Sequence, residues 1–289
     1  MNIQTKITVI AMSLLTTISP TLAQKFTTFE LETSTLHLYA SGNGMNDVSF
    51  IVEGDTSLVV LEQPLYYEHI KEFGEYIAAL DKPIEKVFAN YHICGITPYP
   101  LDKIVMPKSM VEYSQTPAFE GLKSYLETEF KGKADLNITN KSEVIELPSS
   151  QVWAGINFKL SEGVVNDFPA AGVIIDNSAY CTHFAPISGT HVDEWVITSA
   201  DAIDARLQEL RYITASGVKY IIGSHSPVPS TMKDVTFQIE YLSKLKEIYE
   251  SSSDASTFEK SLISTFPNLE NSQYVKAVAK NLYPNEEMQ

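Results

Sequence analysis

The sequence VFANYHICG, residues 87–95, decides how this chain folds and what it can bind. The apolar run over residues 84–89 predicts a buried strand that leads directly into a polar turn. That turn carries His92 and Cys94, whose imidazole and thiol groups are good zinc ligands. Functional residues often lie on loops held by a rigid scaffold, so we predict a cleft at this end of the strand.

Outside this stretch, the hydrophobic pattern alternates between the period of strands and that of helices. Alternation and short apolar runs predict strands over residues 26–39, 48–52, 57–61, 84–89, 103–106, 144–147, 152–160, 171–175, 179–181 and 218–222. Helical spacing predicts helices over residues 66–80, 109–130 (with interruptions), 200–216, 231–251, 257–266 and 272–282. This order favours two sheets with helices outside them over a parallel doubly wound sheet. A dinucleotide site is unsupported, because no strand is followed by Gly-x-Gly-x-x-Gly.

The first residues have the pattern of a cleavable signal peptide. Lys6 supplies a positive start, and residues 7–18 form an apolar run that is too short to span a bilayer. Residues 21–23, Thr-Leu-Ala, fit a cleavage site, so we expect residues 1–23 to be removed and the mature chain to start near Gln24. The prediction is a periplasmic or secreted protein without a transmembrane anchor after signal cleavage.

The charge balance restricts the partners. Asp and Glu number 36 against 21 Lys and Arg, for a net charge of −15. An acidic surface repels nucleic-acid phosphates and anionic lipids, so neither is an expected partner. The expected partner is a small molecule or another protein, of a kind that the sequence does not specify.

Several segments together resemble the metallo-β-lactamase superfamily. Residues 46–63 are similar to its opening hairpin, with Glu62 at the position where an aspartate usually closes the second strand. Residues 84–95 are similar to the strand and metal loop, and residues 173–182 to the strand pair that ends in Gly-Asp. Residues 219–225 are similar to the end of the domain, where His225 matches the final histidine.

The resemblance implies a four-layer αββα sandwich of the α/β (α+β) class with extra C-terminal helices. It divides the chain into the signal peptide at 1–23, a metallo-β-lactamase-like domain at 24–230, and a helical extension at 231–289 packed on the same domain. The active site is expected along one edge of the sandwich.

The family's metal-binding positions are mostly replaced here. Its first histidine corresponds to Asn90, the second to His92, the water-orienting aspartate to Cys94, the next histidine to Gly95, the mid-chain histidine to residues 164–167 with Asp167, the bridging aspartate to Thr182, and the last histidine to His225. Among these positions only His92 and His225 match. The resemblance therefore implies a site that has lost most of its metal ligands.

Two interpretations of the cleft follow, one without metal and one with a single zinc ion. His92 and His225 persist as packed, hydrogen-bonded residues in the first. In the second, His92, His225 and Cys94 bind zinc, with His183 or Asp167 as a further ligand.

The resemblance also brings Cys94 and Cys181 to the cleft, where an oxidising compartment would allow a disulfide between them. The alternative for these residues is two buried free thiols.

The leading functional hypothesis is an exported protein of this fold that has lost its hydrolytic chemistry and binds a ligand in the old cleft, without a cofactor. The alternative is a mononuclear zinc-dependent hydrolase of an ester, lactone or amide. A third possibility is an unrelated two-layer α/β binding protein.

Overall fold

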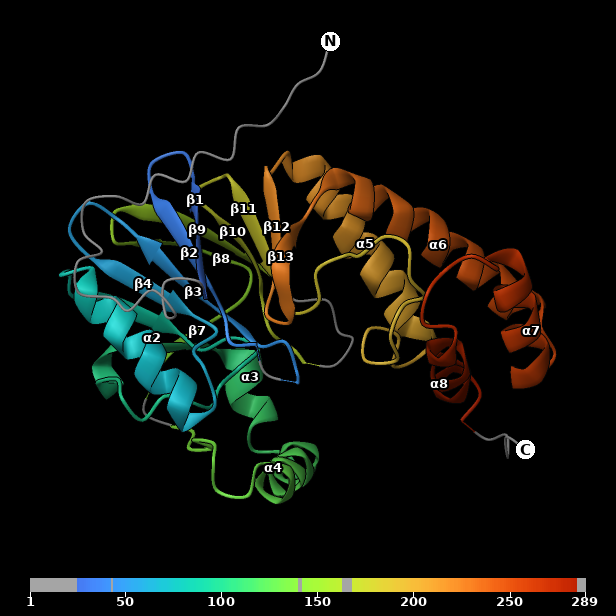
Figure 1. The fold of residues 1–289 in the computed structure, drawn as a ribbon, viewed down its shortest axis with the longest axis horizontal. Helices are drawn as coiled ribbons and strands as arrows, with labels where there is room; N and C mark the ends of the chain where they lie inside the picture. The colour runs from blue at the N-terminus through green and yellow to red at the C-terminus, as the bar shows by residue number, and fades with distance from the viewer. Residues whose placement is uncertain (1–24, 43, 140–141, 163–167, 285–289) are drawn as a thin grey trace, which may run out of the picture.

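Two β-sheets face each other, and helices cover the outer face of each sheet (Figure 1). The computed structural model describes residues 25–42, 44–139, 142–162 and 168–284. The architecture confirms the predicted four-layer αββα sandwich. The predicted signal peptide at residues 1–23 lies outside the described part of the chain.

The first sheet keeps its strands in chain order. It contains β1 (Phe26–Glu30), β2 (Thr35–Ala40), β3 (Val48–Glu53), β4 (Leu58–Leu61), β5 (Ile84–Phe88), β6 (Ile104–Pro107) and β7 (Glu143–Ile145). The first four strands pair antiparallel, and β4 to β7 pair parallel. Parallel neighbours need crossover connections, which helices supply here.

The second sheet has six strands. In spatial order they are β13 (Ser226–Ser230), β12 (Tyr220–Gly223), β11 (Ala179–Thr182), β10 (Gly172–Ile175), β9 (Ile156–Ser161) and β8 (Ser149–Trp153). Its one parallel pair is β11 with β12, and α5 (Ala200–Ser216) connects these two strands.

The remaining helices divide between the two outer faces. Those associated with the first sheet are α2 (Tyr67–Ala79), α3 (Lys108–Tyr113) and α4 (Pro117–Phe130), with the short 3₁₀ helix η2 (Leu101–Lys103). Those packed with α5 beside the second sheet are α6 (Met232–Ser251), α7 (Ala255–Thr265) and α8 (Gln273–Leu282). None of the helices in the described ranges is long and apolar enough to cross a membrane.

Three hydrophobic clusters correspond to the three contacts between layers. The cluster between the sheets includes Phe50 and Val173, and the outer clusters include Phe73 on α2 and Leu207 on α5. Burying apolar surface is the main favourable contribution to folding, at roughly 25 cal/mol per Å². These clusters hold the sheets rigidly, so the loops at the edge of the sandwich have defined positions.

On the outer face of the first sheet, Glu53 lies beside His37 and Lys82. This arrangement predicts how the stability of the fold depends on pH. Glu53 lies 2.9 Å from His37 Nε2 and 2.7 Å from Lys82 Nζ. The hydrogen bond from His37, with help from Lys82, lowers the pKa of Glu53 to about 2. A carboxylate with a lowered folded-state pKa stabilises the fold above its unfolded-state value of 4.5, and this contribution is lost as the pH falls towards 2.

We therefore expect wild-type protein to lose about 1–2 kcal/mol more stability between pH 6 and pH 3 than the Glu53→Gln variant, after discounting for solvent screening. Urea unfolding at several pH values measures the difference. Equal pH dependence of the two proteins would show that Glu53 is not stabilised as described.

Candidate metal centre

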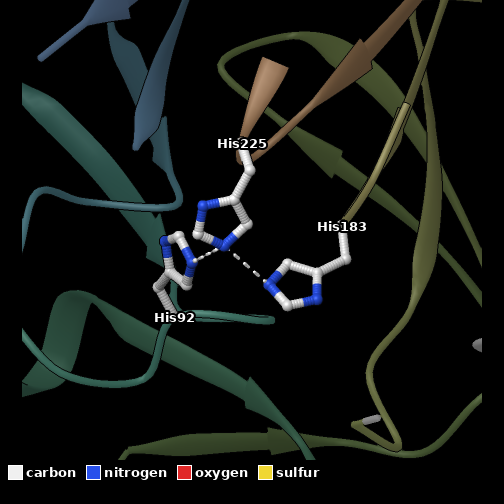
Figure 2. A group of neighbouring side chains, drawn as sticks. All are labelled: His92, His183 and His225. Carbon is white, nitrogen blue, oxygen red and sulfur yellow. Dashed lines mark hydrogen bonds between the residues drawn. The ribbon is translucent and has the colours of Figure 1, made fainter. Parts of the chain in front are cut away.

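Three histidines meet at one edge of the sandwich (Figure 2). Nε2 of His225 lies 3.2 Å from Nε2 of His92 and 3.0 Å from Nε2 of His183. All three ligand atoms lie within 4.8 Å of one another. Imidazole nitrogens on tetrahedral zinc, each 2.0–2.1 Å from the ion, lie about 3.3 Å apart. Two of the three nitrogen–nitrogen distances are therefore close to those of a tetrahedral zinc site.

Each histidine follows a strand end. His92 lies in the loop after β5, His183 directly after β11, and His225 between β12 and β13. Backbone hydrogen bonds join the His183 and His225 segments to each other and to β3: Ser224 N donates to Thr182 O at 3.1 Å, and Val48 N donates to Ser224 O at 2.7 Å. The two sheets thus bring residues from distant parts of the chain to one place.

The His92 loop is held by the residues that follow β4. Glu62 is fully buried, and its carboxylate accepts hydrogen bonds from the backbone N–H groups of Tyr91 at 3.2 Å and His92 at 2.8 Å. The Gln63 amide donates to the carbonyl oxygens of His92 at 2.8 Å and Cys94 at 2.6 Å. Burial raises the pKa of Glu62 to about 7, while the two backbone donors oppose that rise. Residues 62 and 63 therefore fix the path of the loop.

Two oxygen atoms near Nδ1 of His225 set the orientation of its ring. Nδ1 lies 3.0 Å from the Met45 carbonyl oxygen and 3.2 Å from Asp47 Oδ1. Because the carbonyl oxygen can only accept, Nδ1 carries the proton and donates it, which leaves the Nε2 lone pair facing the other histidines. A carboxylate behind a ligating histidine is a common arrangement at metal sites.

Aromatic rings surround His183, which is only 4% exposed. Tyr91 stacks on its imidazole with ring centroids 4.8 Å apart and an interplanar angle of 4°. Phe168 and Phe184 contact it at centroid distances of 5.4 Å and 4.2 Å. Phe184 also stacks against His225 at 5.2 Å. The centre therefore has an apolar wall beside it.

The electrostatic environment of His92 favours its neutral form. Burial lowers the pKa of His92, and the neighbouring His225 contributes to that shift. A neutral imidazole with a free nitrogen lone pair is the form that binds a metal.

Strand alternation explains why His183 joins the centre and Thr182 does not. Tyr180 belongs to the outer cluster, Cys181 to the cluster between the sheets, and Thr182 donates at 2.7 Å to Glu209 on α5. His183 then returns to the inner side, beside His92 and His225. Thr182 therefore points away from the histidine group, and the adjacent residue, His183, lies within it.

Asn90 holds the backbone and is not part of the histidine group. Its Nδ2 donates to Ala171 O at 2.8 Å, and its Oδ1 accepts from Ala171 N at 2.8 Å. The side chain thus joins the His92 loop to the residue before β10. Asp167 and the neighbouring residues 164–166 lie outside the described residues.

The structure does not place Cys94, predicted as a zinc ligand, with the group of three histidines. Cys94 packs in the cluster on the outer side of the first sheet, and burial raises the pKa of its thiol to about 12. A metal ligand must be a thiolate, which this environment disfavours. The described residues that converge as ligands are the three histidines. His183, which the sequence suggested only as an additional ligand, lies with His92 and His225, where Cys94 does not.

The proposed Cys94–Cys181 disulfide is not formed, because both cysteines are free and buried. Cys181 packs between the sheets and Cys94 on the outer side of the first sheet, so they belong to different core layers. The alternative of two buried thiols describes the structure correctly.

Gly95 cannot carry the histidine that the resemblance places there. Its φ of +76° lies in the left-handed region, and an added Cβ would overlap the Pro64 carbonyl oxygen. The Pro64 carbonyl group occupies the space that a side chain at position 95 would need.

Comparison with solved structures supports the fold. The chain is similar to the stereoselective inverting sec-alkylsulfatase Pisa1 from Pseudomonas sp., with a TM-score of 0.58, 12% identity, and coverage of 91% of this chain and 52% of that one. It is similar to a metallo-β-lactamase family protein from Thermus thermophilus, with a TM-score of 0.57, 11% identity, and coverage of 85% and 90%. An archaeal metallo-β-lactamase superfamily protein from Sulfolobus tokodaii matches with a TM-score of 0.53, 12% identity, and coverage of 85% and 98%.

The chain spans about half the length of the alkylsulfatase, and nearly all of the archaeal protein. By sequence, no family profile and no curated protein matches it. At identities this low, the likeness concerns the fold and leaves the reaction open. The chain has the metallo-β-lactamase fold.

Proposed function

We propose that this protein is a mononuclear zinc-dependent hydrolase that acts on an ester, lactone or amide. The observation that carries the proposal is the convergence of Nε2 from His92, His183 and His225, with two nitrogen–nitrogen distances of 3.0 and 3.2 Å. Catalytic zinc sites typically have three protein ligands and one open position, whereas structural sites have four. A three-histidine set is therefore of the catalytic type.

The residues have distinct roles in this proposal. His92, His183 and His225 hold the ion, Asp47 orients His225, and Glu62 fixes the loop that carries His92. When bound, zinc supplies Lewis acidity and lowers the pKa of a coordinated water towards neutrality. The rings around His183 limit the access of other water and offer an apolar surface to the substrate.

A screen of esters, lactones and amides tests the function. We expect zinc-loaded protein to hydrolyse members of one of these classes, and both chelation and His92→Ala to abolish the activity. Hydrolysis that survives chelation and the His92→Ala substitution would contradict the proposal.

A second candidate function is ligand binding without hydrolysis. At the position of the family's water-orienting aspartate, Cys94 packs into the outer cluster. The described group of candidate ligands therefore contains no carboxylate, which favours binding without hydrolysis. Zinc-dependent binding of a ligand that is recovered unchanged would support this alternative over the hydrolase.

Asp47 contacts Nδ1 of His225, the ring nitrogen that does not face the other histidines, and we predict that it affects zinc binding. Replacing it by Asn removes the charge beside His225 Nδ1 while keeping the side-chain shape. We expect Asp47→Asn to weaken zinc binding by about 10-fold, because partners of ligating histidines commonly have effects of this size. Competition with a chromophoric chelator measures the change. Asp55→Asn, at an exposed turn position, is the matched control, and an equal change in both variants would contradict the role of Asp47.

We also propose that the mature chain works in the periplasm or outside the cell. The signal-peptide pattern of residues 1–23 supports this location. Cell fractionation and N-terminal sequencing test it, and a cytoplasmic protein that retains Met1 would contradict it.

A further inference from the structure

A charged pair is buried directly behind the segment that carries His183. Arg206 and Glu209, both on α5, form an ion pair, and their side chains are 1% and 2% exposed. Removing two charges from water is costly unless hydrogen bonds satisfy the groups that remain. The other contacts of this pair therefore indicate what it holds in place.

Those contacts bind the residues on both sides of His183. Glu209 Oε1 accepts a hydrogen bond from Thr182 Oγ1 at 2.7 Å, and Arg206 Nη2 donates to the Phe184 carbonyl oxygen at 2.6 Å. The residues before and after His183 are thus fixed to one helix through a single ion pair.

Further hydrogen bonds fix the pair itself. Tyr180 OH donates to Glu209 Oε1 at 3.1 Å, and Arg206 Nε donates to Gln238 Oε1 at 3.0 Å. Tyr180 lies on β11, and Gln238 lies on α6, so the network joins the second sheet to both helices. Arg206 and Glu209 each have several hydrogen-bond partners that fix their positions, as residues that position a metal ligand require.

We propose that Arg206 and Glu209 are positioning residues that hold His183 in place as the third ligand of the metal centre. This inference rests on the metal centre proposed above. Thr182 turns towards α5 to reach Glu209, and strand alternation then directs His183 towards His92 and His225. The charged pair does not touch the imidazole and acts through the backbone on either side of it.

The sharpest test removes one hydroxyl and leaves the charged pair intact. Thr182→Val keeps the side-chain shape and loses the hydrogen bond to Glu209, whereas Thr182→Ser keeps the hydroxyl. We expect Thr182→Val to raise the zinc dissociation constant by about 10-fold and Thr182→Ser to remain within about twofold of wild type. Competition with a chromophoric chelator measures both values.

A second readout reports geometry independently of affinity. Cobalt(II) in a tetrahedral site absorbs visible light more strongly than cobalt(II) in an octahedral site. We expect wild-type protein and Thr182→Ser to give the intense spectrum, and Thr182→Val to give a weaker one as His183 moves. Identical spectra and dissociation constants in Thr182→Val and wild type would overturn the inference.

A control separates positioning from general loss of stability. Ile248 lies on α6, in the hydrophobic cluster beside the second sheet, and is far in sequence from residues 182–184. We expect Ile248→Val to lower the stability of the protein without changing the hydrogen bonds of residues 182–184. We expect its zinc affinity to equal that of wild type. An equal loss of affinity in Ile248→Val and Thr182→Val would show that the effect is merely structural. Failure of wild-type protein to bind zinc would instead refute the proposed centre.

Discussion

Replacing His225 by Ala is expected to weaken zinc binding by about 100-fold or more. His225 Nε2 is the atom that both other histidines approach, at 3.0 and 3.2 Å. Its loss leaves two imidazoles, whereas stable protein zinc sites ordinarily use three or four ligands. Even loss of a partner behind a ligand weakens binding by 10-fold to 100-fold, so loss of a ligand must cost at least as much. Competition with a chelator of known affinity measures the change.

The control for this experiment is a histidine outside the centre. His191 is buried, and its Nδ1 lies 2.9 Å from Tyr241 OH in a cluster of aromatic rings. We expect His191→Phe to bind zinc as wild type does. If His225→Ala binds zinc normally, or if His191→Phe loses binding to the same extent, the assignment of the ligands is wrong.

Replacing Gly95 by Ala is expected to lower the free energy of unfolding by about 2–4 kcal/mol. The left-handed backbone at φ +76° is strained for an L-residue, and the new Cβ would overlap the Pro64 carbonyl oxygen. The nearest atom outside Pro64 is Gln63 Cγ at 3.4 Å, so relief of the overlap would also disturb the side chain that holds the His92 loop. Urea unfolding measures the loss.

Gly132 offers a control with the same backbone conformation and open space. Its φ is +75°, and an added Cβ meets no atom within 4 Å. Gly132→Ala should therefore cost only about 1 kcal/mol, which is the conformational part of the effect. Equal losses in the two variants would show that the contact with Pro64 is unimportant. A tolerated Gly95→His variant that binds a second zinc ion would also contradict this account of the loop.

The hydrophobic pattern predicted most of the secondary structure because helices and strands here bury regular apolar faces. The helix predicted at 200–216 and the strands at 48–52 and 84–89 agree with the structure within a residue. Such segments have a strong period and clear ends, so local sequence suffices.

The missed elements are those in which local signals conflict. The last strand, Ser226–Ser230, contains two prolines, which usually argue against a strand, but it lies at the edge of the second sheet. The single strand predicted over 152–160 is a hairpin that turns at Ala154 and Gly155, both with positive φ. By contrast, the interruption expected in the helix over 109–130 is present, because that helix ends at Tyr113 and restarts at Pro117.

The candidate site was only partly predictable. His92 and His225 could be aligned with known motif positions, and the structure brings them together. The choice between His183 and Cys94 depended on which way each side chain points after its strand, and one residue of register reverses that direction. Burial then decides the outcome for Cys94, because a thiol inside an apolar cluster stays protonated. Neither effect can be read from residue spacing alone.

Native mass spectrometry of the wild-type chain, loaded with zinc and freed of loosely bound metal, tests the central claim most directly. Three converging imidazoles predict one zinc ion per chain, which a strong chelator removes. A chain that retains no zinc, or one that retains two ions, would contradict a mononuclear three-histidine centre.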